Sequence, residues 1–120
     1  MACVFCEKQD FIYENKYVKV FYDAYPVNEG HVLIVTQRHI PEYFSTTPEE
    51  ARAIDEAIKT MKNRIEKNNA PDGYTIGINN GGAAGQTVFH LHVHLIPRYK
   101  GDVANPSGGV RGVLPHKQHY

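Results

Sequence analysis

The chain has 120 residues, with 13 Lys or Arg against 13 Asp or Glu, so its formal net charge at pH 7 is zero. This length predicts a single domain over residues 1–120, large enough to bury a core without disulfide staples. The balanced charge argues against a polynucleotide partner, because phosphate backbones need a basic stripe, and the basic residues of segment 59–67 are mixed with acidic ones.

The N-terminal segment 1–10 shows no basic region followed by a long apolar run, which argues against a secretory signal. No stretch approaches the roughly 20 apolar residues of a membrane helix. We therefore expect a cytoplasmic protein with no membrane partner. Cys3 and Cys6 are the only cysteines, and they lie too close for a useful disulfide loop. In the cytosol this spacing points to metal or redox chemistry.

Two strands joined by a turn are predicted next. Tyr17–Tyr22 is β-branched and aromatic with partial alternation, as in a strand. His31–Thr36 is a short continuous apolar run, which is typical of a strand covered on both faces. The segment 23–30 between them carries proline, asparagine and glycine, the residues of a turn. The short link predicts an antiparallel hairpin.

Thr47–Asn69 gives the clearest helix prediction. Thr47 can cap the helix, Pro48 suits its first position, and Glu50 completes a T-x-x-E capping box. One apolar stripe follows at spacings of 4, 3 and 4 residues, formed by Ile54, Ile58, Met61 and Ile65. The segment is therefore expected to pack one face on a sheet.

A second pair of strands is predicted at Tyr74–Asn79 and His90–Ile96, with the glycine-rich loop 79–87 between them. The order of strand, strand, helix, strand, strand favours an α+β fold with a helix on one antiparallel sheet. A parallel crossover is the weaker alternative. From residue 101 the chain carries four glycines and two prolines, so an irregular tail is expected. It could close over a phosphate or wrap a partner subunit.

Three of the seven histidines lie at alternate positions of the last predicted strand. His90, His92 and His94 should therefore project from one face, with apolar residues on the other. A row of three imidazoles is costly unless it has a use. The alternatives are surface histidines or an adventitious metal site, because imidazole is a common metal ligand.

The glycine-rich loop that leads into this strand favours a catalytic interpretation. Gly81, Gly82 and Gly85 let the backbone approach an anion closely and turn its N–H groups inward. Gln86 and Thr87 add uncharged side-chain donors. Alone, such a loop is more often a flexible hairpin connection. Its direct junction to the histidines predicts that a phosphate lies beside the imidazoles.

The run Gly85–Arg98 resembles the signature of the histidine triad (HIT) superfamily, H-φ-H-φ-H-φ-φ with φ apolar. Phe21–Asp23 followed by Gly30–Val35 is similar to the family's nucleoside-binding segment, and nearly the whole chain to about Asp102 fits. The chain resembles bacterial and archaeal members with an N-terminal Cys-x-x-Cys and shares features of the fragile histidine triad and nucleoside phosphoramidase branches. The resemblance implies a HIT-like fold and a homodimer.

The resemblance also implies an activity and its residues. The expected activity is hydrolysis at the α-phosphate of adenine (purine) nucleotides, such as diadenosine polyphosphates or adenosine phosphoramidates. His92 would attack phosphorus and form a nucleotidyl-histidine. The family pattern places phosphate contacts at His94 and Thr87, and a contact with the phosphate or the leaving group at Gln86, next to Gly85 of the substrate-binding loop. It also implies a ribose contact at Asp23, a wall of the phosphate pocket at Asn79, a supporting histidine at His31 and the third triad member at His90.

A zinc ion is implied by the same resemblance. Zinc normally takes four cysteine or histidine ligands, so Cys-x-x-Cys alone is half a site. In many relatives the other ligands are a histidine after the second strand and the first triad histidine, which gives the set Cys3, Cys6, His39 and His90. Such a zinc would be structural, since no position is left for water. The alternative is two free thiols and a surface His39.

Other functions stay open from the sequence. A nucleotidyl transferase would need an acceptor other than water, and the presence of His94, where uridylyltransferase relatives carry glutamine, favours hydrolysis. A purine-nucleotide-binding regulatory module with little turnover is a second alternative. A redox or metal-handling protein built on Cys3 and Cys6 is a third.

Overall fold

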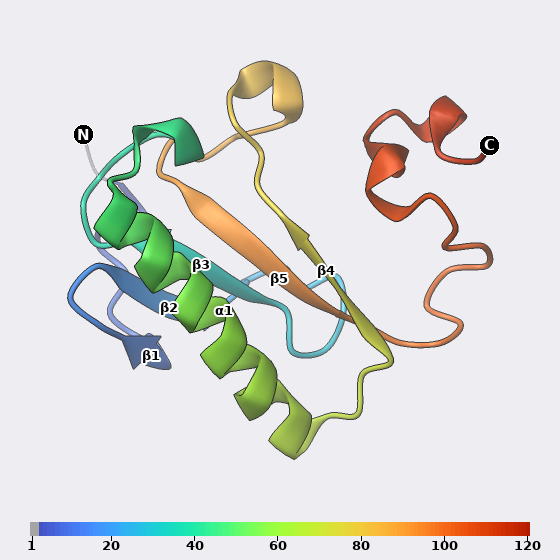
Figure 1. The fold of residues 1–120 in the computed structure, drawn as a ribbon, viewed down its shortest axis with the longest axis horizontal. Helices are drawn as coiled ribbons and strands as arrows, with labels where there is room; N and C mark the ends of the chain where they lie inside the picture. Colours follow the sequence, from blue (N-terminus) through green and yellow to red (C-terminus); the bar gives the residue numbers. More distant parts are fainter. Residues whose placement is uncertain (1–2) are drawn as a thin grey trace.

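A computed structural model describes residues 3–120 and contains a five-stranded sheet with one long helix across it (Figure 1). The elements, listed in chain order, are β1 (Tyr13–Glu14), β2 (Val18–Tyr22), β3 (Val32–Thr36), α1 (Pro48–Asn68), β4 (Gly73–Gly77) and β5 (His92–Arg98). The sheet order is β1-β2-β3-β5-β4, and every neighbouring pair is antiparallel. The predicted α+β fold is confirmed, and no parallel pairing occurs in the described sheet.

Both predicted hairpins form, but some strand ends differ. β2 pairs with β3, and β4 pairs with β5. β4 ends at Gly77 rather than Asn79. β5 begins at His92 rather than His90, because the Leu91 N–H donates to the Ile40 carbonyl at 2.7 Å, outside the sheet. The two-residue β1 was not predicted, since so short a strand has no detectable pattern.

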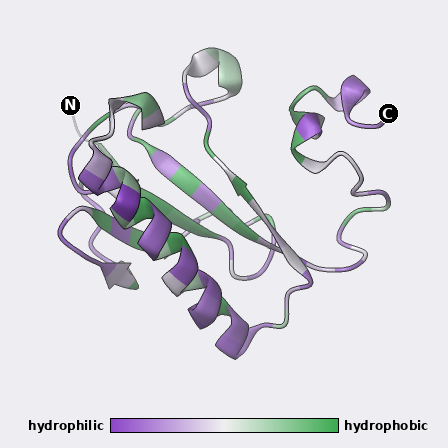
Figure 2. Ribbon diagram, in the orientation of Figure 1, coloured by the Kyte–Doolittle hydropathy of each residue, from purple (hydrophilic) through white to green (hydrophobic). Residues whose placement is uncertain are grey.

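The start of α1 follows the predicted capping box. The Glu50 N–H donates to Thr47 Oγ1 at 3.1 Å, and the Thr47 N–H donates to Glu50 Oε1 at 2.9 Å. In the predicted stripe, Ile54, Met61 and Ile65 are buried, while the half-buried Ile58 packs against them. Figure 2 shows the consequence, a helix that is hydrophilic outside and covers hydrophobic strands.

The sheet has a different cover on each face. Between α1 and the sheet lies the main core, which includes Val20, Ile34 and Leu95. On the opposite face Phe21, Leu33 and Val35 form a second cluster with the half-buried Phe5 and Phe11 of the N-terminal segment. All of β3 is therefore buried, as its apolar run predicted. The second face has no helix over it, which leaves room for a cavity.

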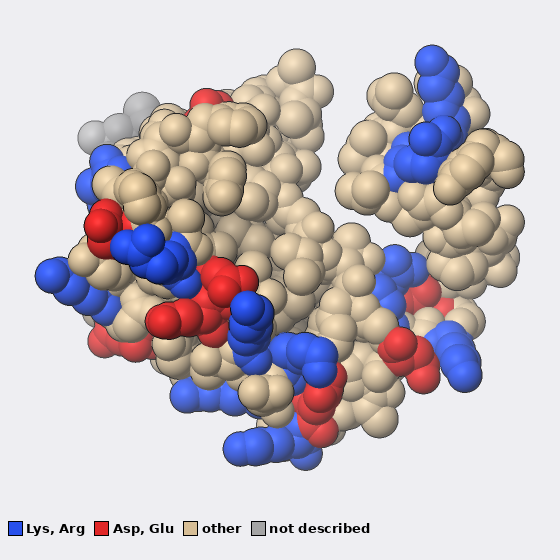
Figure 3. All heavy atoms as spheres, viewed as in Figure 1, with Lys and Arg blue, Asp and Glu red and all other residues tan. Residues whose placement is uncertain are grey.

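Beyond the sheet, the tail contains two short 3-10 helices, η3 (Gly109–Val113) and η4 (Pro115–Lys117). Figures 1 and 3 show it projecting from the body of the molecule. Figure 3 also shows cations and anions interspersed over the outer face of α1, where Lys59 pairs with Asp55 and Lys62 with Glu66. Among residues 3–120, no helix is long and apolar enough to cross a membrane.

Glu50 provides a test of the capping arrangement. It is 3% exposed and accepts two hydrogen bonds from the Arg38 guanidinium, at 2.7 and 3.1 Å. Arg38 holds the pKa of Glu50 below its ordinary value of 4.5. Since the folded state prefers the charged form, this stabilisation is complete above pH 4.5 and is lost as the pH falls through the lower folded-state value.

We expect Glu50→Gln to lower the free energy of unfolding by about 1–2 kcal/mol at pH 7. Urea unfolding at several pH values would measure this, and the difference from the wild type should shrink below about pH 4.5. Glu49→Gln, whose side chain is half exposed, is the matched control. An equal loss at pH 7 and pH 3 would contradict the ionic origin of the effect.

Candidate active site

The three predicted histidine rings lie on one side of the sheet, away from α1. The His92 and His94 ring centroids are 5.2 Å apart. The Phe5 ring lies 5.0 Å from that of His92 and 6.0 Å from that of His90. The alternate residues Leu91, Val93 and Leu95 are buried in the core beneath α1. The predicted separation of polar and apolar faces is thus met, even though His90 precedes β5.

A hydrogen bond to the backbone fixes the orientation of the His92 ring. Its Nδ1 lies 2.9 Å from the His90 carbonyl oxygen. A carbonyl can only accept, so this contact assigns the ring hydrogen of a neutral His92 to Nδ1. The lone pair is then on Nε2. His92 is 9% exposed and lines a cavity, so the ring nitrogen with the lone pair is available to a bound molecule.

The same reasoning gives His94 the opposite polarity. The Val27 N–H donates to His31 Nδ1 at 3.2 Å, which places the hydrogen of a neutral His31 on Nε2. His31 Nε2 lies 2.9 Å from His94 Nδ1 and donates to it, so His94 carries its own hydrogen on Nε2. Burial lowers the pKa of both rings, which favours these neutral forms. His94 is therefore a hydrogen-bond donor beside a nucleophilic His92.

A cavity of about 550 Å³ opens in front of these histidines, within the usual range of small-molecule sites. Its polar lining includes six of the predicted site residues, Asp23, Asn79, Gly85, Thr87, His92 and His94. Its apolar lining includes Val4, Phe5, Phe21 and Leu33. Asp23 Oδ2 also lies 3.4 Å from His31 Nε2, so the acidic residue is joined to the histidine chain.

Gln86 lies outside the lining of the cavity. Its side chain is buried, does not line the cavity, and donates to the carbonyl oxygens of Pro41 at 2.6 Å and Val88 at 3.1 Å. Its Oε1 accepts from the Gly81 N–H at 2.8 Å. These contacts fasten the loop, and the role of Gln86 at a phosphate or leaving group stays a prediction.

The glycines of the loop also differ from expectation. The N–H groups of Gly81 and Gly85 bond within the loop, to Gln86 Oε1 and to the Gly82 carbonyl. They do not point at a bound anion. Gly85 lines the cavity and has φ of +93°, a conformation that favours glycine. The glycines shape the loop, and the predicted side-chain donors that line the cavity are Asn79, Thr87 and His94.

The predicted metal ligands meet at the N-terminal end of β5. The ligand atoms of Cys3, Cys6, His39 and His90 all lie within 4.8 Å of one another. Cys6 Sγ is 3.2 Å from His39 Nδ1 and 3.4 Å from His90 Nδ1. Two sulfur and two nitrogen donors match a closed tetrahedral site. These four residues can therefore hold a metal ion.

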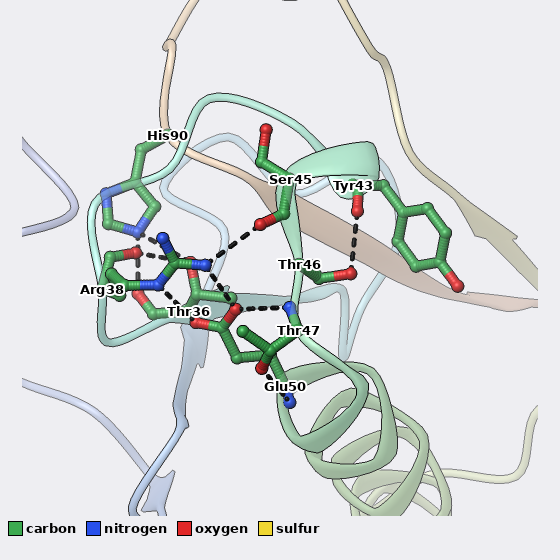
Figure 4. Close-up of polar contacts among 8 residues, drawn as sticks. All are labelled: Thr36, Arg38, Tyr43, Ser45, Thr46, Thr47, Glu50 and His90. Carbon is green, nitrogen blue, oxygen red and sulfur yellow. Dashed lines mark hydrogen bonds and ion pairs between the residues drawn. The ribbon is translucent and has the colours of Figure 1, made fainter.

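The second shell supports this assignment. His90 Nε2 donates to the Thr36 carbonyl at 2.7 Å, which leaves the lone pair on Nδ1, the atom that faces the sulfurs. Figure 4 shows the contacts that connect this segment to the helix cap: the Thr36 hydroxyl donates to the Arg38 carbonyl, and the Arg38 guanidinium donates to Glu50. Burial lowers the pKa of His90, as suits a neutral ligand.

A second cluster, Asp23, His31 and His94, also places its ligand atoms within 4.8 Å of one another. It is a poorer metal site. His31 Nδ1 accepts a backbone hydrogen, so Nε2 carries the ring hydrogen and has no lone pair to give. The hydrogen bond to His94 uses that hydrogen instead. This cluster acts as a hydrogen-bond chain.

Three cavity residues of the N-terminal segment were not predicted from the sequence. Val4 and Phe5 lie between the two cysteines, and Lys8 follows them. The signal was the Cys-x-x-Cys spacing itself, because a turn that gathers both sulfurs must carry the two intervening side chains to one place. The Phe5 ring packs against that of His92, which lines the cavity, so this turn forms part of the cavity wall.

A family model described as HIT domain matches residues 6–101. An uncharacterised HIT-like protein of Methanocaldococcus jannaschii is 40% identical, over 83% of this chain and 81% of its own. A bis(5'-nucleosyl)-tetraphosphatase [asymmetrical] of Schizosaccharomyces pombe is 39% identical, over 75% of this chain and 50% of its own. The crystal structure of a Zn-bound histidine triad family protein from Mycobacterium smegmatis has a TM-score of 0.76 at 32% identity, over 87% and 80% of the two chains.

Proposed function

This chain belongs to the HIT domain family, and from that premise we propose that it hydrolyses adenine or other purine nucleotides at the α-phosphate. The observation that carries the proposal is the pairing of His92 and His94. One neutral ring presents a lone pair and its neighbour presents a hydrogen, both at one cavity. The similarity to a tetraphosphatase supports nucleotide hydrolysis in this family.

The chemistry takes two steps. The lone pair on His92 Nε2 attacks the α-phosphorus, and the bond from phosphorus to the leaving group breaks. The leaving group departs with the electron pair and takes a proton. Water then attacks the phosphorus of the nucleotidyl-histidine, which releases the nucleoside monophosphate and frees His92. The His94 Nε2–H and the Thr87 hydroxyl stabilise the charge on the phosphate oxygens.

The remaining cavity residues hold the nucleoside. We assign the ribose hydroxyls to Asp23 and a phosphate contact to Asn79, since both line the cavity beside His94. Gly85 lets the loop approach the phosphate closely. The half-buried Phe5, with the buried Phe21 ring 5.4 Å behind it, offers an apolar surface to the base. His31 keeps His94 in its donor form.

We also propose that the Cys3, Cys6, His39 and His90 site takes zinc. Its donor set fits that metal, and the similarity to a Zn-bound relative supports the assignment. Zinc would supply structure there, because the four ligands leave no open position. Dimer formation, a cytoplasmic location and the absence of nucleic-acid or membrane partners remain predictions from the sequence.

The proposal is tested by assaying adenosine 5'-phosphoramidate and diadenosine tetraphosphate side by side in ¹⁸O-water. We expect AMP that carries one ¹⁸O, because water attacks the α-phosphorus. The faster substrate identifies the leaving group as an amine or a phosphate. If folded protein turns over neither nucleotide, or if the label enters the other product, the proposed reaction is wrong. Nucleotide binding without turnover would favour the regulatory alternative.

A further inference from the structure

Lys8 is an unusual member of the cavity lining. Among the described residues that line the cavity, Lys8 and Asp23 are the two with a charged ammonium or carboxylate group. Asp23 belongs to the histidine end, within 3.4 Å of His31. Lys8 instead lies at the aromatic surface, with its Nζ 5.3 Å from the centroid of the Phe21 ring. The described cavity therefore carries opposite charges in different parts.

Two phenyl rings connect Lys8 to His92, where the α-phosphate of a nucleotide would lie. The Phe5 ring is 5.0 Å from that of His92, and the Phe21 ring is 5.4 Å from that of Phe5. The Lys8 ammonium follows as the next neighbour of Phe21. A nucleotide with its α-phosphate at His92 and its base on the phenyl rings would thus turn an edge of the base toward Lys8.

The backbone of Lys8 is held in place from two sides. Its N–H donates to the Phe5 carbonyl at 3.4 Å. Its carbonyl accepts from the ammonium of Lys19 at 3.2 Å, and Lys19 is 6% exposed and also donates to the Cys6 carbonyl at 3.4 Å. The position from which the Lys8 side chain extends is therefore fixed to the turn that carries Phe5.

The Lys8 side chain keeps donors available for a ligand. Its Nζ lies 3.3 Å from Asp10 Oδ1, but the Asp10 side chain is 85% exposed and does not line the cavity. Such a solvent-exposed pair is weak. An ammonium has three hydrogens to donate and cannot accept. The Lys8 ammonium can therefore donate hydrogen bonds to the edge of a base without losing a strong contact within the protein.

We infer that Lys8 selects guanine and hypoxanthine over adenine in this cavity. Guanine presents two acceptors, N7 and O6, on one edge, and hypoxanthine shares them. Adenine presents N7 beside an amino group that donates, which an ammonium cannot satisfy. The inference rests on the proposed function, because it requires a nucleotide in the cavity. It replaces the expected adenine with a 6-oxopurine.

Calorimetric titration with GMP, IMP and AMP tests this without any dependence on turnover. The wild type should bind GMP and IMP about tenfold more tightly than AMP. Lys8→Met, which keeps the length of the side chain, should bring the three affinities within about threefold of one another. Lys59→Met, on the exposed face of α1, is the control and should keep the wild-type ratio.

The outcomes separate this inference from the proposed hydrolysis. Equal affinities in the wild type, or a base preference that survives Lys8→Met, would overturn the role of Lys8. A variant that weakens all three nucleotides alike would show that Lys8 serves the phosphate or the fold, and would overturn it too. Selective binding without turnover would refute the hydrolysis and leave the inference standing. No binding of any of the three would refute both.

Discussion

His92→Ala is expected to reduce turnover of adenosine 5'-phosphoramidate by about 10⁴-fold or more, since it removes the nucleophile. The neighbouring imidazole is not oriented to replace it. His94 is the nearest imidazole, but its Nδ1 accepts from His31, so its remaining nitrogen carries a hydrogen. The loss should fall on kcat, because Asp23, Thr87 and the aromatic surface proposed to bind the nucleotide are unchanged.

Two measurements separate this loss from a structural defect. Wild type quenched in alkali, where the P–N bond of a nucleotidyl-histidine survives, should carry an added nucleotide by mass spectrometry, and the variant should carry none. Binding of a nucleoside monophosphate should change by less than about tenfold. His116→Ala, an exposed tail histidine, is the matched control and should keep full activity. Turnover by His92→Ala within tenfold of the wild type would rule out the covalent mechanism.

Cys6→Ser is expected to have the second large effect, on both metal binding and stability. A closed four-ligand site that loses one thiolate should lose most of its affinity, and the folding free energy that the metal supplies is then lost as well. We expect zinc to fall from about one per chain to a small fraction. Unfolding should become easier by several kcal/mol. Elemental analysis and thermal unfolding would measure the two effects.

The same substitution should weaken nucleotide binding. Val4 and Phe5 line the cavity, and they are held between the two cysteines. When the turn between Cys3 and Cys6 is no longer held by the metal, part of the apolar surface proposed for the base is lost. Binding is reciprocal, so a bound nucleotide should tighten zinc binding by the same factor. Glu7→Gln, an exposed neighbour, is the control. Purified wild type without zinc, together with an unchanged melting temperature in Cys6→Ser, would disprove the metal site.

Local signals explain why the fold could be predicted so closely from the sequence. The capping box at Thr47 and the stripe from Ile54 to Ile65 are helical regardless of the rest of the chain, and both were confirmed. The alternation of histidines with apolar residues also depends only on the strand period. This alternation correctly predicted that His92 and His94 lie on the face of the sheet opposite the main core beneath α1.

The differences arise where a distant contact overrides the local pattern. The strand pattern runs through His90, but the bond from Leu91 to the Ile40 carbonyl takes that segment out of the sheet. Gln86 lies in a polar loop, and nothing in its neighbours shows that Pro41 would bind its amide. Phe5 and Lys8 reach the cavity only because the N-terminal turn packs on Phe21.

The internal position of β5 has a consequence for how the protein becomes active. β5 is the last strand in the chain, yet it lies between β3 and β4, which make no direct pairing with each other. During synthesis the first hairpin and α1 can form early, but the sheet stays open until Arg98 has emerged. His92 and His94 enter with the strand that closes it. An active molecule is therefore one whose sheet is complete, so turnover can report on the final step of folding.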